Sequence, residues 1–294
     1  MTDAVLVASV LDGLIDPWRS GIMQRALLEV VLLGATGGLL GCWIVWGGLS
    51  YSAEALPHAM FPGLVGAALL GLPLVLGGAV GLLVAALLIA AVARVPSLDR
   101  DTSISVVFTS MFGLGTLMAL SPDTPTGVSE LLFGDVLGLT NGDVAVAAAL
   151  TAVVLLALRL LHPRLLATTF DRDGARSAGL RPGVTDVALI VLIAVATLVC
   201  VQALGNLFVA ATLVAPAATA RLLGRRLGPS MALAVGIALL SGVGGLLLSY
   251  HAGTATGASI AGVTVAVYLV VAAAAGVRGT LTGRARGPRR TRTG

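Results

Sequence analysis

Residues 229–250 read PSMALAVGIALLSGVGGLLLSY, a run of 22 positions without one charged side chain. An α-helix of this length rises about 33 Å at 1.5 Å per residue, and the hydrocarbon core of a bilayer is about 30 Å thick. The run therefore predicts a helix that crosses a membrane.

Runs of the same kind recur along the chain, at 24–46, 73–95, 102–121, 142–161, 183–204 and 256–277. Two further segments, 51–71 and 205–223, are apolar but interrupted. Hydrophobic residues make up 57% of the 294 positions and charged residues 11%, which is far from the composition of a soluble domain. Aromatic residues are scarce and glycine is abundant, which favours closely packed helices over a membrane β-barrel. We expect an all-α, polytopic membrane protein with eight or nine transmembrane helices, two of them broken.

The two interrupted segments contain helix-breaking residues. Pro57, Pro62 and Gly63 lie in the first segment, and Pro216 lies in the second. Proline inside a span removes a backbone hydrogen bond, and this is tolerated where neighbouring helices or a cavity satisfy the freed carbonyl. Broken helices of this kind are typical of the transport path in membrane transporters.

Arginine sets the predicted orientation. The 94–100, 159–181 and 221–226 connections and the C-terminal tail are rich in arginine, whereas 122–141 and 251–255 contain none. The first group is therefore expected in the cytoplasm. Nine crossings would place the N-terminus outside, and eight would change that assignment. We expect an extramembrane segment over 1–23, a transmembrane domain over 24–277, and a basic, disordered cytoplasmic tail over 278–294 that lies near anionic lipid and binds no nucleic acid.

The sequence lacks the motifs that ATP hydrolysis, a metal cluster or a disulfide framework would need. No GxxxxGK[ST] motif occurs, so the chain is not expected to hydrolyse ATP by itself. Cys42 and Cys200 lie in apolar runs without a CxxC spacing, which gives no support to a metal cluster or a disulfide framework.

Glu54 and His58 are the most unusual residues of the apolar region. Their spacing of four places them on one helical face, about 9 to 15 Å deep if the helix enters the bilayer near residue 48. An ionisable pair at that depth is costly unless it faces a polar interior or a wet cavity. A carboxylate with an imidazole suits zinc or manganese. A proton relay would use the same pair, and a mutual hydrogen bond would satisfy both groups without any transport role.

Two features at the membrane surfaces are each open to two interpretations. His251, in LLLSYHAGTATG at the outer end of a predicted span, is either a ligand that the ion meets first or an ordinary surface histidine. The amphipathic connection 163–182 either lies on the membrane surface or forms a short docking helix for a partner, with Phe170 as an anchor.

Five segments, in one order, resemble the membrane permease of metal-type ABC importers, the zinc, manganese and iron uptake family. They are EALPHAMFPG at 54–63, ISVVFTSMFG at 104–113, LFGDVLG at 132–138, FDRDGARSAGL at 170–180, and 208–223. The resemblance extends from about Ile22 to Val277.

The resemblance implies roles for individual residues. Glu54 and His58 take the positions of the family's intramembrane aspartate and histidine, which implies metal coordination on the permeation path. The family's coupling helix corresponds to the stretch that includes Phe170, Asp171, Ala175 and Gly179, which implies contact with an ATPase subunit. Two departures are Glu54 in place of aspartate and Pro57 in place of serine, and both bear on metal preference.

The resemblance thus implies a homodimeric permease in the bacterial cytoplasmic membrane that is not itself an enzyme. It would import a divalent zinc, manganese or iron ion without a permanently bound cofactor. Two ATPase subunits would supply energy, and an extracytoplasmic metal-binding protein would deliver the ion. Two alternatives remain at this point: a proton-coupled secondary transporter that uses Glu54 as proton carrier, and an ABC permease for an organic metal chelate.

Overall fold

The computed structural model describes residues 16–92, 100–121, 138–224 and 226–285, together with positions 132, 134 and 136. Within these residues the regular secondary structure is entirely helical. Most of the predicted outer connection 122–141 and the ends of the chain lie outside the described residues. The elements are η1 (Asp16–Arg19), α2 (Gly21–Trp46), α3 (Ser50–Leu70), α4 (Leu74–Val92), α5 (Arg100–Ala119), α7 (Asn141–Phe170), α8 (Arg172–Ser177), α9 (Pro182–Leu204), α10 (Val209–Leu223), α11 (Leu227–Ala252) and α12 (Thr256–Ala285).

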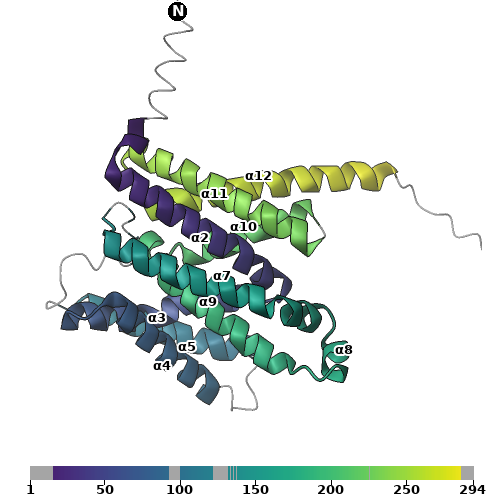
Figure 1. Ribbon diagram of the computed structural model, residues 1–294, viewed down its shortest axis with the longest axis horizontal. Helices are drawn as coiled ribbons and strands as arrows, with labels where there is room; N and C mark the ends of the chain where they lie inside the picture. Colours follow the sequence, from purple (N-terminus) through teal and green to yellow (C-terminus); the bar gives the residue numbers. More distant parts are fainter. Residues whose placement is uncertain are drawn as a thin grey trace, which may run out of the picture.

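In the described part of the chain, each of the nine predicted apolar segments forms a helix of its own. Seven of these helices are long and apolar enough to cross a membrane, and the apolar stretches of α4 and α10 are shorter. Figure 1 shows η1 at one end of the bundle, and α8 and the end of α12 at the other. The all-α polytopic prediction is confirmed. By the positive-inside rule, we expect the end that carries α8 to face the cytoplasm.

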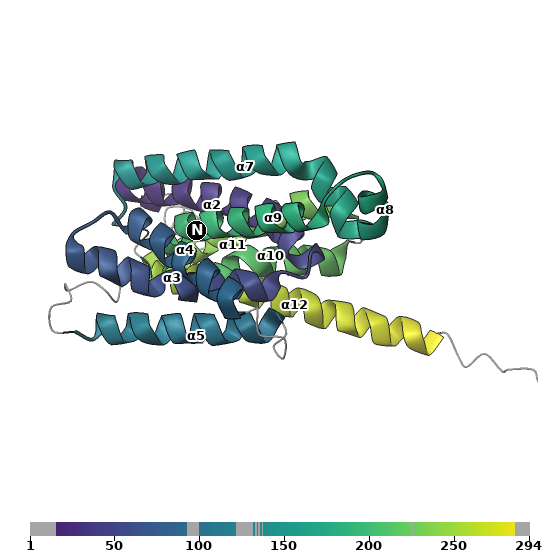
Figure 2. The same ribbon diagram turned by 90° about the horizontal axis from the view of Figure 1, so that it is seen from below.

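The core of the bundle is formed by α2, α3 and α9, whose apolar spans are more than half buried. The spans of α5, α7 and α12 are less than one third buried. Figure 2 shows α7 along one side of the bundle and α5 along the other, with α2, α9 and α10 between them. The outer helices therefore present most of the apolar surface that lipid or a second subunit would cover.

Glycine lets α2 pack tightly between α10 and α11. A methyl group at Gly38 would lie 2.6 Å from the Cα atom of Val235 in α11, and one at Gly37 would lie 3.1 Å from the carbonyl oxygen of Thr212 in α10. Small residues spaced along a membrane helix allow backbones to approach in this way. Two faces of α2 are thus fixed by backbone contact.

We expect Gly38→Ala to lower the thermal unfolding temperature of the purified protein in detergent. The added methyl group forces the backbones of α2 and α11 apart, and overpacking of this kind costs about 1 to 3 kcal/mol. Gly236→Ala is the matched control, because nothing lies within 4 Å of a methyl group at that position of α11. Equal unfolding temperatures for the two variants would contradict this packing.

Helices α3 and α10 continue through their prolines. Pro57 and Pro62 lie inside α3, Pro216 lies inside α10, and all three are buried. Each proline therefore removes one backbone hydrogen bond from a helix that continues past it, and neither helix ends at a predicted interruption. Gly63 has a packing role: a methyl group there would lie 2.8 Å from the Cα atom of Gly81, so glycine permits the close approach of α4 to α3.

Several predicted boundaries fall short of the helix ends. Helix α2 begins at Gly21, α7 continues past Pro163 to Phe170, and α12 continues to Ala285. The predicted connection 163–182 thus consists largely of the end of α7 and of α8, and the predicted disordered tail begins as helix over 278–285. A helix satisfies its own backbone hydrogen bonds in lipid and in water alike. Apolar composition consequently marks the end of a span and not the end of a helix.

Candidate functional site

Glu54 lies on the wall of an open cavity of about 560 Å³ between α3, α10 and α12. Its side chain is exposed, although it belongs to a membrane-spanning helix whose span is mostly buried. Tyr51 and Tyr268 line the same cavity. Small residues of α10 form the rest of one wall, at positions Ala210, Ala211, Ala215 and Ala218. Their short side chains leave room for water or an ion beside the carboxylate.

His58 follows one helical turn later and faces α5. Its ring centroid lies 5.0 Å from that of Phe112 and 6.0 Å from that of Phe108. The Nδ1 atom is buried and has no hydrogen-bond partner among the described residues. Buried polar atoms are nearly always paired, so an unpaired imidazole nitrogen on a membrane helix calls for a partner that the described residues do not provide.

The two side chains do not satisfy each other. Within the described residues, Glu54 and His58 form neither a hydrogen bond nor an ion pair. The mutual hydrogen bond that would have made the pair purely structural is thus not formed. Both groups keep lone pairs that could coordinate a cation.

Tyr51 stabilises the position of this part of α3. Its hydroxyl group shares a hydrogen bond with the hydroxyl group of Ser105 in α5, and its ring centroid lies 6.1 Å from that of Phe108. The spacing of Tyr51, Glu54 and His58 is that of one helical face, so the sequence held a signal for Tyr51. It held none for Tyr268, because only the fold brings α12 beside α3.

His251 is exposed at the last turn of α11, and its Nδ1 atom lies 2.8 Å from the carbonyl oxygen of Leu247. Since a carbonyl oxygen only accepts, Nδ1 donates this hydrogen bond, and in the neutral ring Nε2 is the nitrogen with the lone pair. The structure does not place His251 in a ligand cluster: the described residues contain no group of three or more His, Cys, Asp or Glu side chains that could hold a metal ion.

The predicted coupling segment forms the turn between α7 and α9 at the end of the bundle that carries α8. Asp171 caps α8, because its Oδ1 atom accepts a hydrogen bond of 2.8 Å from the backbone N–H of Gly174. Gly179 adopts a positive φ of 80°, a conformation that glycine enters readily, and turns the chain toward α9. Arg172 forms hydrogen bonds of 2.9 Å to both carboxylate oxygens of Asp186 in α9.

Two of the predicted coupling residues differ sharply in exposure. Phe170 is 56% exposed at the end of α7, as a contact residue should be in the isolated chain. Ala175 is only 3% exposed, because it lies on the side of α8 that packs against α7 and α9. Ala175 therefore anchors the short helix and does not belong to its outer face.

We expect Asp171→Ala to speed amide hydrogen exchange in α8 by roughly fivefold, because loss of an N-cap costs about 1 kcal/mol. The control is Asp173→Ala, which removes only an exposed pair with Arg176. Mass spectrometry of peptides from 168–180 would measure both effects. Unchanged exchange in the Asp171 variant would contradict the capping role.

Three other reactive or ionisable residues of the apolar runs do not line the cavity beside Glu54. Cys42 and Cys200 are free and buried. Glu29, in α2, is 2% exposed, and its Oε2 atom has no hydrogen-bond partner among the described residues. Glu29 is the one carboxylate within the run 24–46, so its unusual position is visible in the sequence.

The chain was compared with known proteins. Residues 19–275 match the model of the ABC 3 transport family. The manganese import system permease protein ScaB of Streptococcus parasanguinis is 30% identical over 266 residues, which cover 90% of this chain and 94% of ScaB. The chelated iron transport system membrane protein YfeC of Yersinia pestis is 30% identical over 88% of each chain.

A solved structure agrees with these matches. PsaBC from Streptococcus pneumoniae in complex with Fab superposes with a TM-score of 0.82 at 27% identity, covering 89% of this chain and 95% of that chain. The family match includes every long helix from α2 to α11 and most of α12. The chain belongs to the ABC 3 transport family, as a multi-pass membrane permease of an ABC importer whose ATPase is a separate subunit.

Proposed function

We propose that this permease carries a divalent manganese or iron ion into the cell, and that Glu54 and His58 are ligands on its path. The observation that carries the proposal is an exposed carboxylate on the wall of a cavity between membrane helices, with a histidine nitrogen one turn away that has no partner among the described residues. Oxygen and nitrogen donors suit both ions. The two relatives described above are named for manganese and iron, which favours these ions over zinc.

A second copy of the chain would complete the site. One chain offers two ligands, and among the described residues no third His, Cys, Asp or Glu joins them. The cavity that Glu54 lines is open, and its walls come from α3, α10 and α12. A homodimer with these faces opposed would place two Glu54 and two His58 side chains around one axis, giving up to four ligands to a single ion.

Two ATPase subunits would drive the dimer from the cytoplasm, one against each α8. Phe170 would anchor the contact, and the Arg172–Asp186 pair would transmit movement of α8 to α9. ATP binding and release would then open the central site to each side in turn. An extracytoplasmic metal-binding protein would deliver the ion at the opposite end, where Nε2 of His251 is a candidate first ligand.

Uptake into proteoliposomes tests this function against both alternatives. The permease, with its ATPase inside and its binding protein outside, should accumulate radioactive manganese or iron only when ATP is enclosed. Uptake by the permease alone in a pH gradient would instead identify a secondary transporter. Uptake of iron only as a complex with an organic chelator would identify a chelate permease.

We expect uptake to fall as the pH is lowered from 8 to 5.5, because a protonated imidazole cannot bind a metal and histidine ordinarily titrates near pH 6.5. Initial rates at saturating ATP and limiting metal would show the decline, with ATP hydrolysis measured in parallel to exclude a failing ATPase. A rate that rises toward acid pH would contradict histidine ligation and favour coupling to protons.

A further inference from the structure

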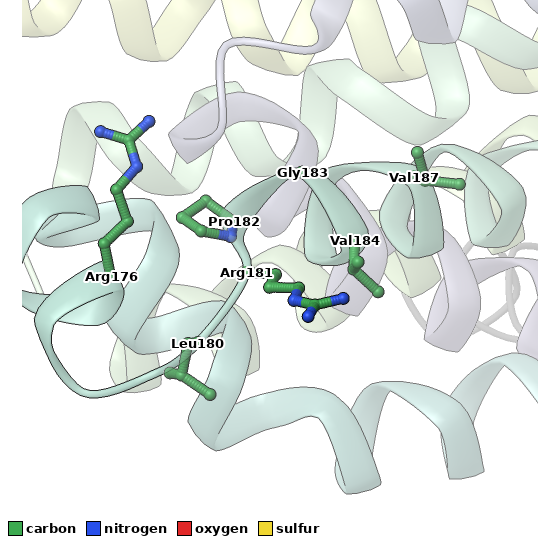
Figure 3. Close-up of a pocket in the computed structure, with 7 residues that line it drawn as sticks. All are labelled: Arg176, Leu180, Arg181, Pro182, Gly183, Val184 and Val187. Carbon is green, nitrogen blue, oxygen red and sulfur yellow. The ribbon is translucent and has the colours of Figure 1, made fainter.

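A groove of about 670 Å³ lies where the connection from α8 enters α9. Figure 3 shows its lining, with the guanidinium groups of Arg176 and Arg181 on two sides and with Leu180, Val184 and Val187 among its apolar residues. The volume falls within the range of roughly 300 to 1,000 Å³ that small-molecule sites occupy. The metal path does not use this groove, because Glu54 lines a different cavity.

The charged residues that line the groove are two arginines, Arg176 and Arg181, and no carboxylate lines it. Arg181 is exposed and forms no ion pair within the described part of the chain. The three nearby carboxylates already have partners: Asp171 accepts a hydrogen bond from the backbone N–H of Gly174, Asp173 pairs with Arg176 at 2.9 Å, and Asp186 pairs with Arg172. The pair with Asp173 uses one nitrogen of Arg176, so further N–H donors of that guanidinium remain for a ligand. Guanidinium groups in this setting recognise phosphate.

An apolar strip continues from the charged end of the groove along α9. Val184, Val187 and Val191 are 63%, 61% and 53% exposed, and their spacing places them on one face of the helix. Because α9 spans the membrane, this strip leads from the cytoplasmic surface into the hydrocarbon region. A free phosphate ion would leave the strip uncovered, whereas a molecule with a phosphate head and an acyl chain would fit both parts.

We propose that this groove binds an anionic phospholipid of the cytoplasmic leaflet. Arg181 and Arg176 hold the headgroup phosphate, and one acyl chain lies along Val184, Val187 and Val191. The cytoplasmic surface is where anionic lipid attracts basic residues close to a span. The bound lipid would lie directly beside α8, the helix proposed to contact the ATPase, so the lipid would brace that helix from the membrane side.

Photocrosslinking to the permease–ATPase complex in nanodiscs tests the site. A phosphatidylglycerol with a photoactivatable acyl chain should label peptides that contain 184–191, and the matching phosphatidylcholine should label them far less. Arg181→Gln should lower labelling by phosphatidylglycerol by about fivefold, the factor that one basic residue near an anionic surface contributes. Arg181→Lys keeps the charge and should retain most of the labelling.

Arg226→Gln is the matched control, because Arg226 precedes α11 as Arg181 precedes α9, with extended backbone at both positions. Its labelling of 184–191 should equal that of the wild type. Millimolar inorganic phosphate should not displace the lipid. The proposal is wrong if phosphatidylcholine labels equally well, or if Arg181→Gln leaves labelling unchanged. Unchanged labelling together with weaker retention of the ATPase would instead assign the groove to that protein. The outcome is independent of metal ligation at Glu54 and His58.

Discussion

His58→Ala is expected to reduce ATP-driven uptake of manganese or iron by about 100-fold or more. Loss of a residue that only supports a metal ligand costs about 10- to 100-fold in affinity or activity, so loss of a ligand should reach at least the upper end of that range. The alanine also removes the nitrogen donor that each chain gives to the proposed site, and the described residues contain no group of three or more His, Cys, Asp or Glu side chains that could hold the ion instead.

The control for this variant is His162→Ala. His162 lies on α7 with its ring centroid 5.4 Å from that of Trp43, a packing contact outside the cavity. Its replacement should leave uptake within about twofold of the wild type, as a surface-proximal packing change usually does. Equal uptake by the His58 variant and the wild type, at equal amounts of protein in the membrane, would refute the ligand role.

Two substitutions of Glu54 distinguish the effect of its charge from the effect of its side-chain length at the same site. Glu54→Gln removes the negative charge and should lose uptake as His58→Ala does, whereas Glu54→Asp keeps it and moves the carboxylate by about one bond. The aspartate variant should therefore transport, with its preference between manganese and iron altered. Competition between the two ions would measure that change.

Phe170→Ala is expected to reduce both uptake and metal-stimulated ATP hydrolysis by about 30-fold, because an aromatic anchor at the centre of a protein contact contributes about 2 kcal/mol or more. Its side chain is 56% exposed beside α8 in the single chain, which leaves it free to enter a groove on the ATPase. Co-purification of the ATPase with the tagged permease would measure the contact directly.

Leu166→Ala provides the comparison on the same helix. Leu166 lies one turn before Phe170 on α7 and is 42% exposed, so the variant also removes an exposed apolar side chain near the cytoplasmic end. It should retain the ATPase. Full retention of the ATPase by the Phe170 variant would show that the contact lies elsewhere. The metal site could still be correct in that case, because metal binding in the absence of ATP does not require this contact.

The helices were predictable because each must bury about 20 apolar residues in lipid, and this requirement is written locally in the chain. The ends of the helices were less predictable than their positions. Helices α7 and α12 continue through 162–170 and 278–285 although these stretches contain Pro163, Gly279 and Gly283, since backbone hydrogen bonds close equally well outside the bilayer. Glycine was ambiguous for a similar reason. Gly63 was interpreted as a break, but its role depends on Gly81 of α4, which approaches only in the folded bundle.

In the candidate site, some features could be predicted from the sequence and others depend on the fold. Glu54 and His58 were predictable, because ionisable groups in an apolar run stand out without any structure. The exposure of Glu54, the aromatic surroundings of His58 and the burial of Ala175 depend on helices that are distant in sequence. Tyr268 joins the cavity across more than 200 residues of sequence, and no local pattern marks it.

The stoichiometry of metal binding tests the central claim most directly. The permease–ATPase complex, purified without ATP and equilibrated with manganese, should hold one ion for every two copies of this chain, measured by elemental analysis against protein concentration. The His58→Ala complex, of the same assembly size, should hold none at that manganese concentration. One ion per single copy, or equal binding by the His58 variant, would contradict a shared site built from Glu54 and His58 of two subunits.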